Sequence, residues 1–448
     1  MGRLFGTDGV RGVANDELTA TMAFKLGRTA AKVLGKMKPG LILVGRDTRI
    51  SGQMLESALK AGICSMGIDV GELGILPTPA VAYLTRHYKA LCGIVISASH
   101  NPGEYNGIKF FNGEGNKLSD EVEDEIEAHM DECLDWEGPT GKNIGICKDF
   151  SDGSNIYENF LVDTIPVDLK GLKIALDCGH GALYNIAPNV IKKLGGEVIA
   201  INTKPDGMNI NDNCGSTNPQ MISELVRSSN ADIGMSFDGD GDRIIAVDEV
   251  GNVIDGDHIL AISALWLKNN AKLSNDIVVG TVMSNLGLKK YLESIGVELI
   301  MAPVGDRYVL EDMQRLGASI GGEQSGHIIF LDYNTTGDGL ATGLHLTEIS
   351  VKMGRALSEL NQLMVNYPQV LVNAKVANSM KYYYEEEAVI KDAILKIEET
   401  FDGEGRVVIR PSGTEPLVRV MIEGKDQSNI TEHATALANL IEERMNEN

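Results

Sequence analysis

Gly93-Ile-Val-Ile-Ser-Ala-Ser-His-Asn-Pro-Gly-Glu-Tyr-Asn-Gly-Ile-Lys-Phe-Phe111 changes from apolar to polar residues and back again. Residues 94–96 predict a short buried strand, a polar loop follows, and residues 108–111 predict a second strand. The stretch brings a hydroxyl, an imidazole and an amine to one strand end, those of Ser99, His100 and Lys109. Ser99 is either a nucleophile, which needs a neighbouring base or cation, or part of a turn that only reverses the chain. Both interpretations stay open on this stretch alone.

The same order of elements occurs three times between residues 40 and 335. Each unit has a strand ending in glycine, a helix, a second strand, another helix, and a third strand followed by a polar loop and an apolar strand. The three polar loops are Ser97-Ala-Ser-His-Asn101, Asp238-Gly-Asp-Gly-Asp242 and Gly322-Glu-Gln-Ser-Gly-His327. Alternating strands and helices predict mostly parallel sheets, whose ligands bind beyond the carboxyl ends of the strands. The alternative is that unrelated α/β domains share this pattern.

The chain after about Tyr367 has a different pattern, which predicts a smaller C-terminal α+β domain with strands at residues 370–376, 406–409 and 417–422. The predicted fold class is therefore α/β, with three similar mixed α/β sheet domains and this smaller domain. We place the domains at 1–152, 153–253, 254–366 and 367–448.

Composition limits the partners and the compartment. The chain has 448 residues and a formal net charge of −23, which argues against nucleic acid or an anionic membrane as the main partner. No apolar run is long enough to span a bilayer. The six cysteines form no Cys-x-x-Cys pair, which favours free thiols in a reducing cytoplasm. We expect a cytoplasmic protein.

The loop of the second unit predicts a metal site. Asp238, Asp240 and Asp242 alternate with glycines, and three carboxylates in so short a turn repel one another unless a cation lies among them. Hard oxygen ligands favour Mg²⁺. An EF-hand is a poorer match because Arg243 occupies the position of its invariant glycine. A solvated acidic turn is the remaining alternative.

The loop of the third unit and one C-terminal loop predict ligand recognition. Glu323 and Ser325 suit the hydroxyls of a sugar, whereas His327 is either a functional imidazole or the cap of a strand end. Arg410-Pro-Ser-Gly-Thr-Glu-Pro416 predicts a phosphate site, or alternatively only a tight hairpin. Its candidate phosphate ligands are Arg410, Ser412, Gly413, Thr414 and the nearby Arg419. Near the first unit, Arg11, Arg46 and Arg49 are candidates to offset negative charge locally.

Together these loops predict phosphoryl transfer. A serine, a carboxylate-bound Mg²⁺ and a separate phosphate site indicate that a phosphoryl group passes to and from Ser99 while a second phosphate is held elsewhere. A hydrolase needs only one phosphate site, whereas two sites suit an isomerisation through a bisphosphorylated intermediate. The general acid and base stay unassigned among His100, Lys109 and His327.

Over almost its whole length the sequence resembles the α-D-phosphohexomutase superfamily. The resemblance rests on Phe5-Gly-Thr-Asp-Gly-Val-Arg-Gly12, Ser97-Ala-Ser-His-Asn-Pro102, Asn106-Gly-Ile-Lys-Phe-Phe111, Asp238-Gly-Asp-Gly-Asp-Arg243, Gly322-Glu-Gln-Ser-Gly-His327 and Arg410-Pro-Ser-Gly-Thr-Glu-Pro416. It implies four domains around a central cleft, a phosphoserine at Ser99, and one Mg²⁺ held by Asp238, Asp240, Asp242 and the serine's phosphate.

The resemblance also implies an activity. This is the interconversion of glucosamine 6-phosphate and glucosamine 1-phosphate, with glucosamine 1,6-bisphosphate as activator, on the route to UDP-N-acetylglucosamine and cell-wall precursors. A homodimer is a further implication. The alternatives are a phosphomannomutase/phosphoglucomutase with the same residues, a sugar-phosphate-binding regulator without catalysis, and a metal-dependent phosphatase.

Overall fold

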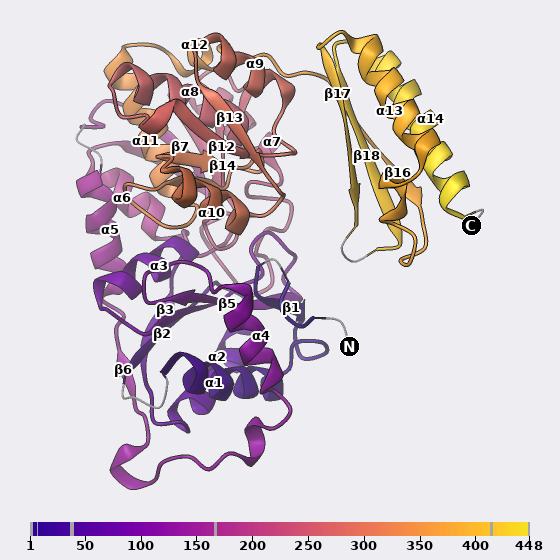
Figure 1. Cartoon of the computed structure of the whole chain (residues 1–448). Coiled ribbons are helices and arrows are strands. Elements are labelled where there is room, and N and C mark those ends of the chain that lie inside the picture. The colour runs from indigo at the N-terminus through magenta and orange to yellow at the C-terminus, as the bar shows by residue number, and fades with distance from the viewer. Residues whose placement is uncertain (1–2, 7, 36–39, 165–167, 413–414, 447–448) are drawn as a thin grey trace. The chain divides into compact units, whose positions relative to one another are not determined.

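The computed structural model describes residues 3–6, 8–35, 40–164, 168–412 and 415–446 (Figure 1). The chain divides into two compact units, and each is described by itself. Unit 1 comprises Met1–Thr281 and Val297–Leu363, and unit 2 comprises Val282–Gly296 and Met364–Asn448.

The first sheet of unit 1 has the strand order β1-β5-β4-β2-β3-β6. Its strands are β1 (Val10–Val13), β2 (Leu41–Arg46), β3 (Asp69–Ile75), β4 (Cys92–Ile96), β5 (Tyr105–Asn112) and β6 (Cys147–Asp149). β2 is parallel to β3 and β4, whereas β5 is antiparallel to β4 and β1. The strands predicted at 94–96 and 108–111 are confirmed within β4 and β5.

Helices cover both faces of this sheet. Figure 1 shows α1 (Ala20–Gly35) and α2 (Gly52–Cys64) on one face and α3 (Thr78–His87) on the other. Buried side chains of α1 and α2 pack with alternate residues of the strands, such as Ile42 and Val44 of β2, because successive strand residues point to opposite faces. α4 (Asp120–Ala128) follows β5 in the sequence and packs against α1.

The second sheet has the order β11-β10-β9-β7-β8. Its strands are β7 (Lys173–Asp177), β8 (Glu197–Ile201), β9 (Ile233–Phe237), β10 (Ile244–Val247) and β11 (Val253–Ile254). The helices of this part are α5 (Gly153–Thr164), α6 (Ile186–Lys193) and α7 (Pro219–Ser229). β7 is parallel to β8 and β9, and β10 is antiparallel to β9.

The third sheet has the order β13-β12-β14-β15. Its strands are β12 (Ile277–Thr281), β13 (Glu298–Ala302), β14 (Ile320–Gly322) and β15 (Ile328–Phe330). The helices here are α8 (Gly256–Asn269), α10 (Asp306–Leu316), α11 (Gly339–Met353) and α12 (Leu357–Asn361). β12 is parallel to β13 and β14, and β15 is antiparallel to β14.

The three sheets share one local topology. In each, a strand that is parallel to its central neighbour ends in the polar loop and is followed by an antiparallel strand: β4 by β5, β9 by β10, and β14 by β15. The predicted threefold recurrence is therefore confirmed, and the sheets are mixed because the strand after each loop turns back.

Unit 2 contains a small antiparallel sheet with the order β16-β18-β17. Its elements are α9 (Leu286–Ser294), β16 (Gln369–Lys375), α13 (Ala388–Phe401), β17 (Gly405–Pro411), β18 (Leu417–Gly424) and α14 (Gln427–Asn446). Figure 1 shows α13 and α14 side by side against one face of this sheet. The predicted fold class is thus confirmed. The domain boundaries and the central cleft stay predictions.

Candidate active site

Ser99 lies in the polar loop after β4 in a backbone conformation that is uncommon for residues with a side chain. Its φ is 53°, and the residue is only 2% exposed. Its Oγ donates a hydrogen bond to Asp238 Oδ2 at 2.6 Å. Its backbone N–H donates to Ser97 Oγ at 2.9 Å. A left-handed conformation costs about 1–2 kcal/mol in a non-glycine residue, so the contacts around the loop must hold it in place.

Arg49 supplies several of those contacts. Its buried guanidinium pairs with Asp47 at 2.8 Å and donates to the carbonyl oxygens of Ser99 at 3.0 Å and Asn101 at 2.8 Å. Asn211 lies in the segment between β8 and α7, and its side-chain amide donates to the same two carbonyls at 2.9 and 3.1 Å. The sequence indicated only that Arg49 could offset negative charge, whereas the structure places it as a support of the Ser99 loop.

The three aspartates of the predicted metal site lie together between β9 and β10. One carboxylate oxygen from each of Asp238, Asp240 and Asp242 falls within 4.8 Å of the others, and all three residues are buried. Burial, followed by the charges of Asp242 and Asp240, raises the pKa of Asp238 well above its usual value.

These residues fit a divalent cation. Among the described residues, Oδ1 of Asp240 and Oδ1 of Asp242 are buried without a hydrogen-bond partner. Buried carboxylate oxygens normally have partners, and an oxygen-binding cation such as Mg²⁺ would supply one here. A cation would also offset the mutual repulsion of the three carboxylates.

Lys109, on β5, lies beside the same cluster and is 1% exposed. Its Nζ is 2.8 Å from Asp240 Oδ2, 2.9 Å from Asp8 Oδ2 and 3.8 Å from Asp242 Oδ2. Burial lowers the pKa of Lys109, but these carboxylates outweigh it and raise the pKa above its usual range. Lys109 is therefore a fixed positive charge.

Asp8 is a site residue that sequence reasoning missed, although the surrounding motif was recognised. It bridges Lys109, Lys117 and, at 2.8 Å, Arg11. Burial raises the pKa of Asp8, but these three cations outweigh it and hold the pKa well below its usual value. Only the contacts with residues about a hundred positions away distinguish this aspartate from a surface one.

His100 is next to Ser99 and contacts an arginine. Its Nδ1 is 3.4 Å from Ser99 Oγ and 3.0 Å from Arg243 Nη1. Burial, followed by the charges of Arg243 and Arg11, lowers the pKa of His100 to about 4. The ring is therefore neutral at physiological pH, with Nδ1 accepting from Arg243. Arg11 itself donates to Asn101 Oδ1 at 3.3 Å.

His327 connects the third loop to the cluster of three aspartates. Its Nδ1 is 3.6 Å from Asp242 Oδ2, and its Nε2 accepts from the backbone N–H of Gly337 at 2.9 Å. Burial lowers the pKa of His327, but Asp242 and Asp306 outweigh it and raise the pKa. On the same loop, Glu323 accepts from the N–H of Gly305 at 3.2 Å, and Ser325 is exposed.

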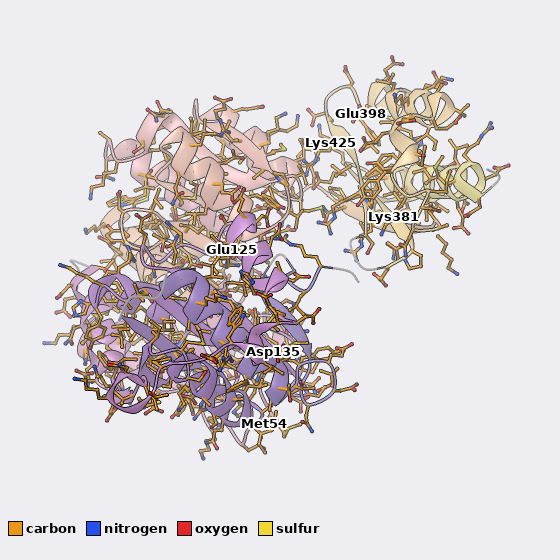
Figure 2. All side chains as sticks on the ribbon, turned by 60° about the horizontal axis from the view of Figure 1, so that its bottom comes forward. Met54, Glu125, Asp135, Lys381, Glu398 and Lys425 are labelled. Atoms are coloured by element: carbon orange, nitrogen blue, oxygen red, sulfur yellow. The ribbon has the colours of Figure 1, made fainter. Side chains whose placement is uncertain are left out.

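The predicted phosphate ligands belong to unit 2, at the hairpin between β17 and β18. Arg410 and Arg419 are directly paired across the two strands, so their side chains share one face. Ser412 Oγ accepts from the N–H of Glu415 at 3.1 Å, and buried Lys381, labelled in Figure 2, donates to the carbonyls of Ser412 and Glu415. Gly413 and Thr414 lie outside the described residues.

The candidate residues thus fall into two groups. Unit 1 brings together the serine, the three aspartates, and the basic and imidazole groups, namely Ser99, Asp238, Asp240, Asp242, Lys109, Arg11, His100 and His327. Glu323 and Ser325 lie on the loop of His327. Arg410, Ser412 and Arg419 are in unit 2.

Comparison with known families gives consecutive matches along the chain. Residues 2–134, 154–251 and 255–367 match the phosphoglucomutase/phosphomannomutase alpha/beta/alpha domains I, II and III, and residues 371–440 match the C-terminal domain of the same family.

Similar structures have the same fold. A phosphoglucomutase/phosphomannomutase family protein from Burkholderia thailandensis superimposes with a TM-score of 0.81 at 25% identity, covering 98% of each chain. The N-acetylphosphoglucosamine mutase of Aspergillus fumigatus, solved in complex with GlcNAc-6P and magnesium, has a TM-score of 0.71 at 19% identity, covering 99% of this chain and 96% of that one.

Close relatives match from end to end. The chain is 58% identical to the phosphoglucosamine mutase of Alkaliphilus oremlandii over 100% of both chains. It is 55% identical to that of Finegoldia magna over 99% of both chains, and 54% identical to that of Clostridioides difficile over 99% of this chain and 100% of the relative. Identity at this level over whole chains shows the family: the chain belongs to the phosphoglucomutase/phosphomannomutase family, and within it to the phosphoglucosamine mutases.

Proposed function

We propose that this enzyme interconverts glucosamine 6-phosphate and glucosamine 1-phosphate, with Ser99 carrying the phosphoryl group. The observation that carries the proposal is the contact of Ser99 Oγ with Asp238, 2.6 Å away, at the edge of a buried cluster of three carboxylates. A hydroxyl in this position can hold a phosphate against a cation bound by the cluster.

The proposed reaction starts from phosphorylated Ser99. The oxygen of a sugar hydroxyl attacks phosphorus, the bond from phosphorus to Ser99 Oγ breaks, and the proton lost by the sugar hydroxyl is balanced by the one that Oγ gains. The resulting glucosamine 1,6-bisphosphate turns round and returns its other phosphoryl group to Ser99. Free bisphosphate can phosphorylate Ser99 in the same way, which accounts for its proposed role as activator.

The surrounding residues have distinct proposed roles. Asp238, Asp240 and Asp242, together with the phosphate on Ser99, would hold one Mg²⁺ per chain, which neutralises charge on the transferring phosphoryl oxygens. Lys109 supplies a permanent positive charge beside the cluster. Arg11 and neutral His100 orient the Ser99 loop, and His327 orients Asp242.

Substrate recognition is proposed for two further groups of residues. Glu323 and Ser325 would bind sugar hydroxyls. The phosphate that is not transferred would be held by the unit 2 hairpin, through Arg410, Ser412, Gly413, Thr414 and Arg419.

The proposed place of the reaction is the cytoplasm, where it supplies precursors of UDP-N-acetylglucosamine and the cell wall. The six cysteines are free thiols, which suits that compartment.

Within the described residues, no helix combines the length and apolar character that a membrane crossing requires. A homodimer and the absence of nucleic-acid partners stay proposals, which rest on the family resemblance and on the net charge of −23.

The test is turnover combined with intact mass. We expect the enzyme with Mg²⁺ to convert glucosamine 1-phosphate to the 6-phosphate and to carry one phosphate. Ser99→Ala should lose both properties, whereas Ser294→Ala, a substitution on an exposed part of α9, should keep both. A clear preference for glucose or mannose 1-phosphate would favour the alternative mutase, and release of free phosphate without isomerisation would favour a phosphatase.

A further inference from the structure

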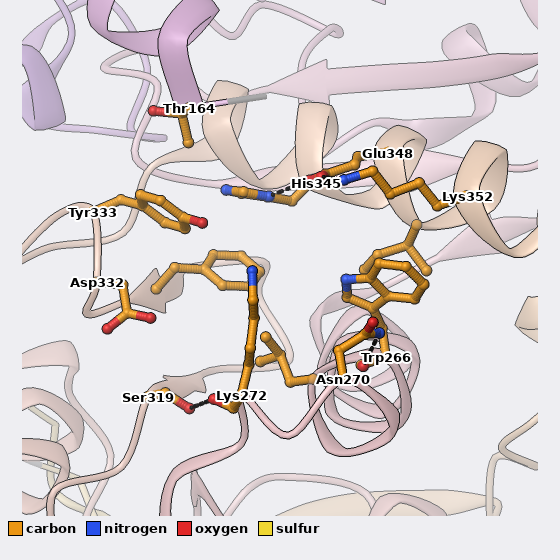
Figure 3. Close-up of a pocket in the computed structure, with 13 residues that line it drawn as sticks. Thr164, Trp266, Asn270, Lys272, Ser319, Asp332, Tyr333, His345, Glu348 and Lys352 are labelled. Atoms are coloured by element: carbon orange, nitrogen blue, oxygen red, sulfur yellow. Dashed lines mark hydrogen bonds and ion pairs between the residues drawn. The ribbon is translucent and has the colours of Figure 1, made fainter. Parts of the chain in front are cut away.

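A cavity of about 410 Å³ lies between α8, α11 and the segment after β15, within unit 1. None of the residues proposed for phosphoryl transfer lines it. Its volume is within the range of small-molecule sites. Figure 3 shows its wall, with Trp266 and Lys352 on one side, Tyr333 on the other, and His345 above Lys272.

Aromatic rings form much of this wall. The ring of His345 lies 4.8 Å from that of Phe330 and 4.8 Å from that of Tyr333, nearly parallel to the latter at 28°. The indole of Trp266 lines the same space and is partly exposed. Such a wall favours a ligand with a flat, conjugated ring, because that ring can stack on the aromatic rings of the wall. A bulky saturated ligand cannot stack in this way.

His345 presents an unused nitrogen within this wall. The residue is 6% exposed, and its Nδ1 lies 3.1 Å from Glu348 Oε2. Because a carboxylate only accepts, Nδ1 carries the hydrogen, and in the neutral ring Nε2 has a lone pair. Among the described residues, Nε2 has no hydrogen-bond partner. A buried acceptor without a partner is unfavourable, so this atom is suited to a donor on a ligand, such as a ring N–H or an exocyclic amine.

The charged side chains that line the cavity are those of Lys272, Lys352, Glu348 and the exposed Asp332, and one of the two lysines is suited to an anion. The ammonium of Lys352 lies 2.5 Å from Glu348 Oε1, so it is already paired. Lys272 lines the cavity and is exposed, and among the described residues no carboxylate forms an ion pair with its ammonium. A free ammonium at the edge of an aromatic cavity can bind a phosphate.

We propose that this cavity binds a nucleotide, with its base stacked among Trp266, Tyr333 and His345, a base N–H donating to His345 Nε2, and its phosphate on Lys272. A sugar phosphate is a poorer match because a sugar has no flat conjugated ring to stack on Trp266, Tyr333 and His345. This site is separate from the proposed mutase reaction and does not depend on it.

The test uses Trp266 as the reporter. The chain has two tryptophans, and the other, Trp136, does not line the cavity but stacks with the Lys32 ammonium at 3.5 Å. In full-length Trp136→Phe protein, we expect adenosine 5′-monophosphate to quench the fluorescence with half-saturation below ~1 mM. Adenosine should quench more weakly, and inorganic phosphate should not quench.

Substitutions separate the two parts of the ligand. Lys272→Ala should raise the half-saturating concentration of the monophosphate at least fivefold and leave that of adenosine unchanged. His345→Phe, which keeps a ring in the wall, should weaken both. Lys268→Ala is the matched control, because Lys268 is on the same helix as Trp266 but pairs with Asp276 and does not line the cavity. Absence of quenching at millimolar nucleotide, equal quenching by phosphate, or equal effects of Lys272→Ala and Lys268→Ala would overturn the proposal.

Discussion

Lys109 shows how much one buried charge contributes to this site. It lies within 4 Å of Asp8, Asp240 and Asp242, and it is the positive charge closest to Asp240 in the described structure. Removing one partner of a buried ion pair is costly because the remaining charges stay desolvated. The lysine and the carboxylates therefore form one electrostatic unit rather than a set of independent side chains.

We expect Lys109→Met to destabilise the protein. In buffer without divalent cations, the free energy of unfolding should fall by about 3–5 kcal/mol, measured by urea denaturation. Mg²⁺ should recover part of the loss, because a cation in the aspartate cluster replaces some of the missing positive charge. Lys148→Met is the control: its exposed pair with Asp69 should contribute less than about 1 kcal/mol. Equal losses for the two variants would contradict the argument.

Glu123 on α4 predicts a pH dependence. Burial raises its pKa to about 7, although Arg307 and Arg3 act in the opposite direction. The folded state therefore holds this proton more tightly than the unfolded chain, whose value is near 4.5. The stabilisation from this group is complete below that value and is lost as the pH rises through 7.

We expect the free energy of unfolding of the native chain, relative to Glu123→Gln, to fall by about 1 kcal/mol between about pH 4.5 and pH 8. The change is smaller than the pKa shift alone would give, because solvent screens a group this close to the surface. Urea denaturation at a series of pH values measures it. Glu125→Gln, an exposed position on the same helix that is labelled in Figure 2, should give no such slope. A difference that grows with pH would show the opposite sign and refute the assignment.

Sequence reasoning found the residues whose neighbours are close in the chain. Ser99 and the three aspartates lie in short polar loops, and the alternation of aspartate with glycine indicates a cation without any structure. Asp8 and the supporting role of Arg49 were not found, because both depend on contacts with residues 50 or more positions away. A single charged residue in a glycine-containing loop gives no local pattern that distinguishes a supporting role in the site from a position on the protein surface.

At the scale of elements, the close packing of α1 and α2 depends on small residues. A Cβ on Gly27 would lie 2.3 Å from the carbonyl oxygen of Leu59, and one on Gly62 would lie 2.2 Å from that of Phe24. The two helices therefore meet through their backbones at these positions. A substitution there must either separate the helices or distort one of them.

We expect Gly27→Ala to destabilise the protein by about 1–3 kcal/mol despite the better helix propensity of alanine. Thermal denaturation followed by circular dichroism measures the effect. Gly35→Ala, on the same helix, is the control, because its nearest neighbour would be the flexible Cδ1 of Ile68 at 2.9 Å. If both variants were equally stable, backbone contact between the helices would not be limiting.

The order of the elements was predictable, but their pairing was only partly so. Glycine-bounded apolar runs indicated the strands, and the threefold recurrence indicated an α/β fold. The antiparallel direction of β5, β10 and β15 is set by the short connections across the polar loops, and apolar character does not reveal it. The first helix predicted for the third unit exists as α9, which follows β12, yet its contacts place it in unit 2.

At the scale of the whole molecule, the chain enters unit 2 at Val282, returns to unit 1 at Val297 and enters unit 2 again at Met364. Unit 2 is built from two separate segments, and the side chain of Asn285 joins them. Asn285 accepts from the N–H of Tyr367 at 2.9 Å and donates to its carbonyl at 3.0 Å, and it also caps α9 by accepting from Gly287. Loss of this side chain leaves the partly buried backbone groups of Tyr367 and the buried N–H of Gly287 without this partner, which costs about 1–3 kcal/mol.

We therefore expect Asn285→Ala to speed amide hydrogen exchange in β16, β17 and β18 while exchange in β2, β4 and β7 of unit 1 stays unchanged. Asn334→Ala is the mirror control, since Asn334 is a buried asparagine of unit 1 that bonds to Arg86 at 2.8 Å and to Pro79 at 3.3 Å. It should speed exchange in unit 1 alone. If either variant accelerated exchange in both units equally, the two units would unfold as one cooperative body, because a local loss of stability is confined only where unfolding is itself local.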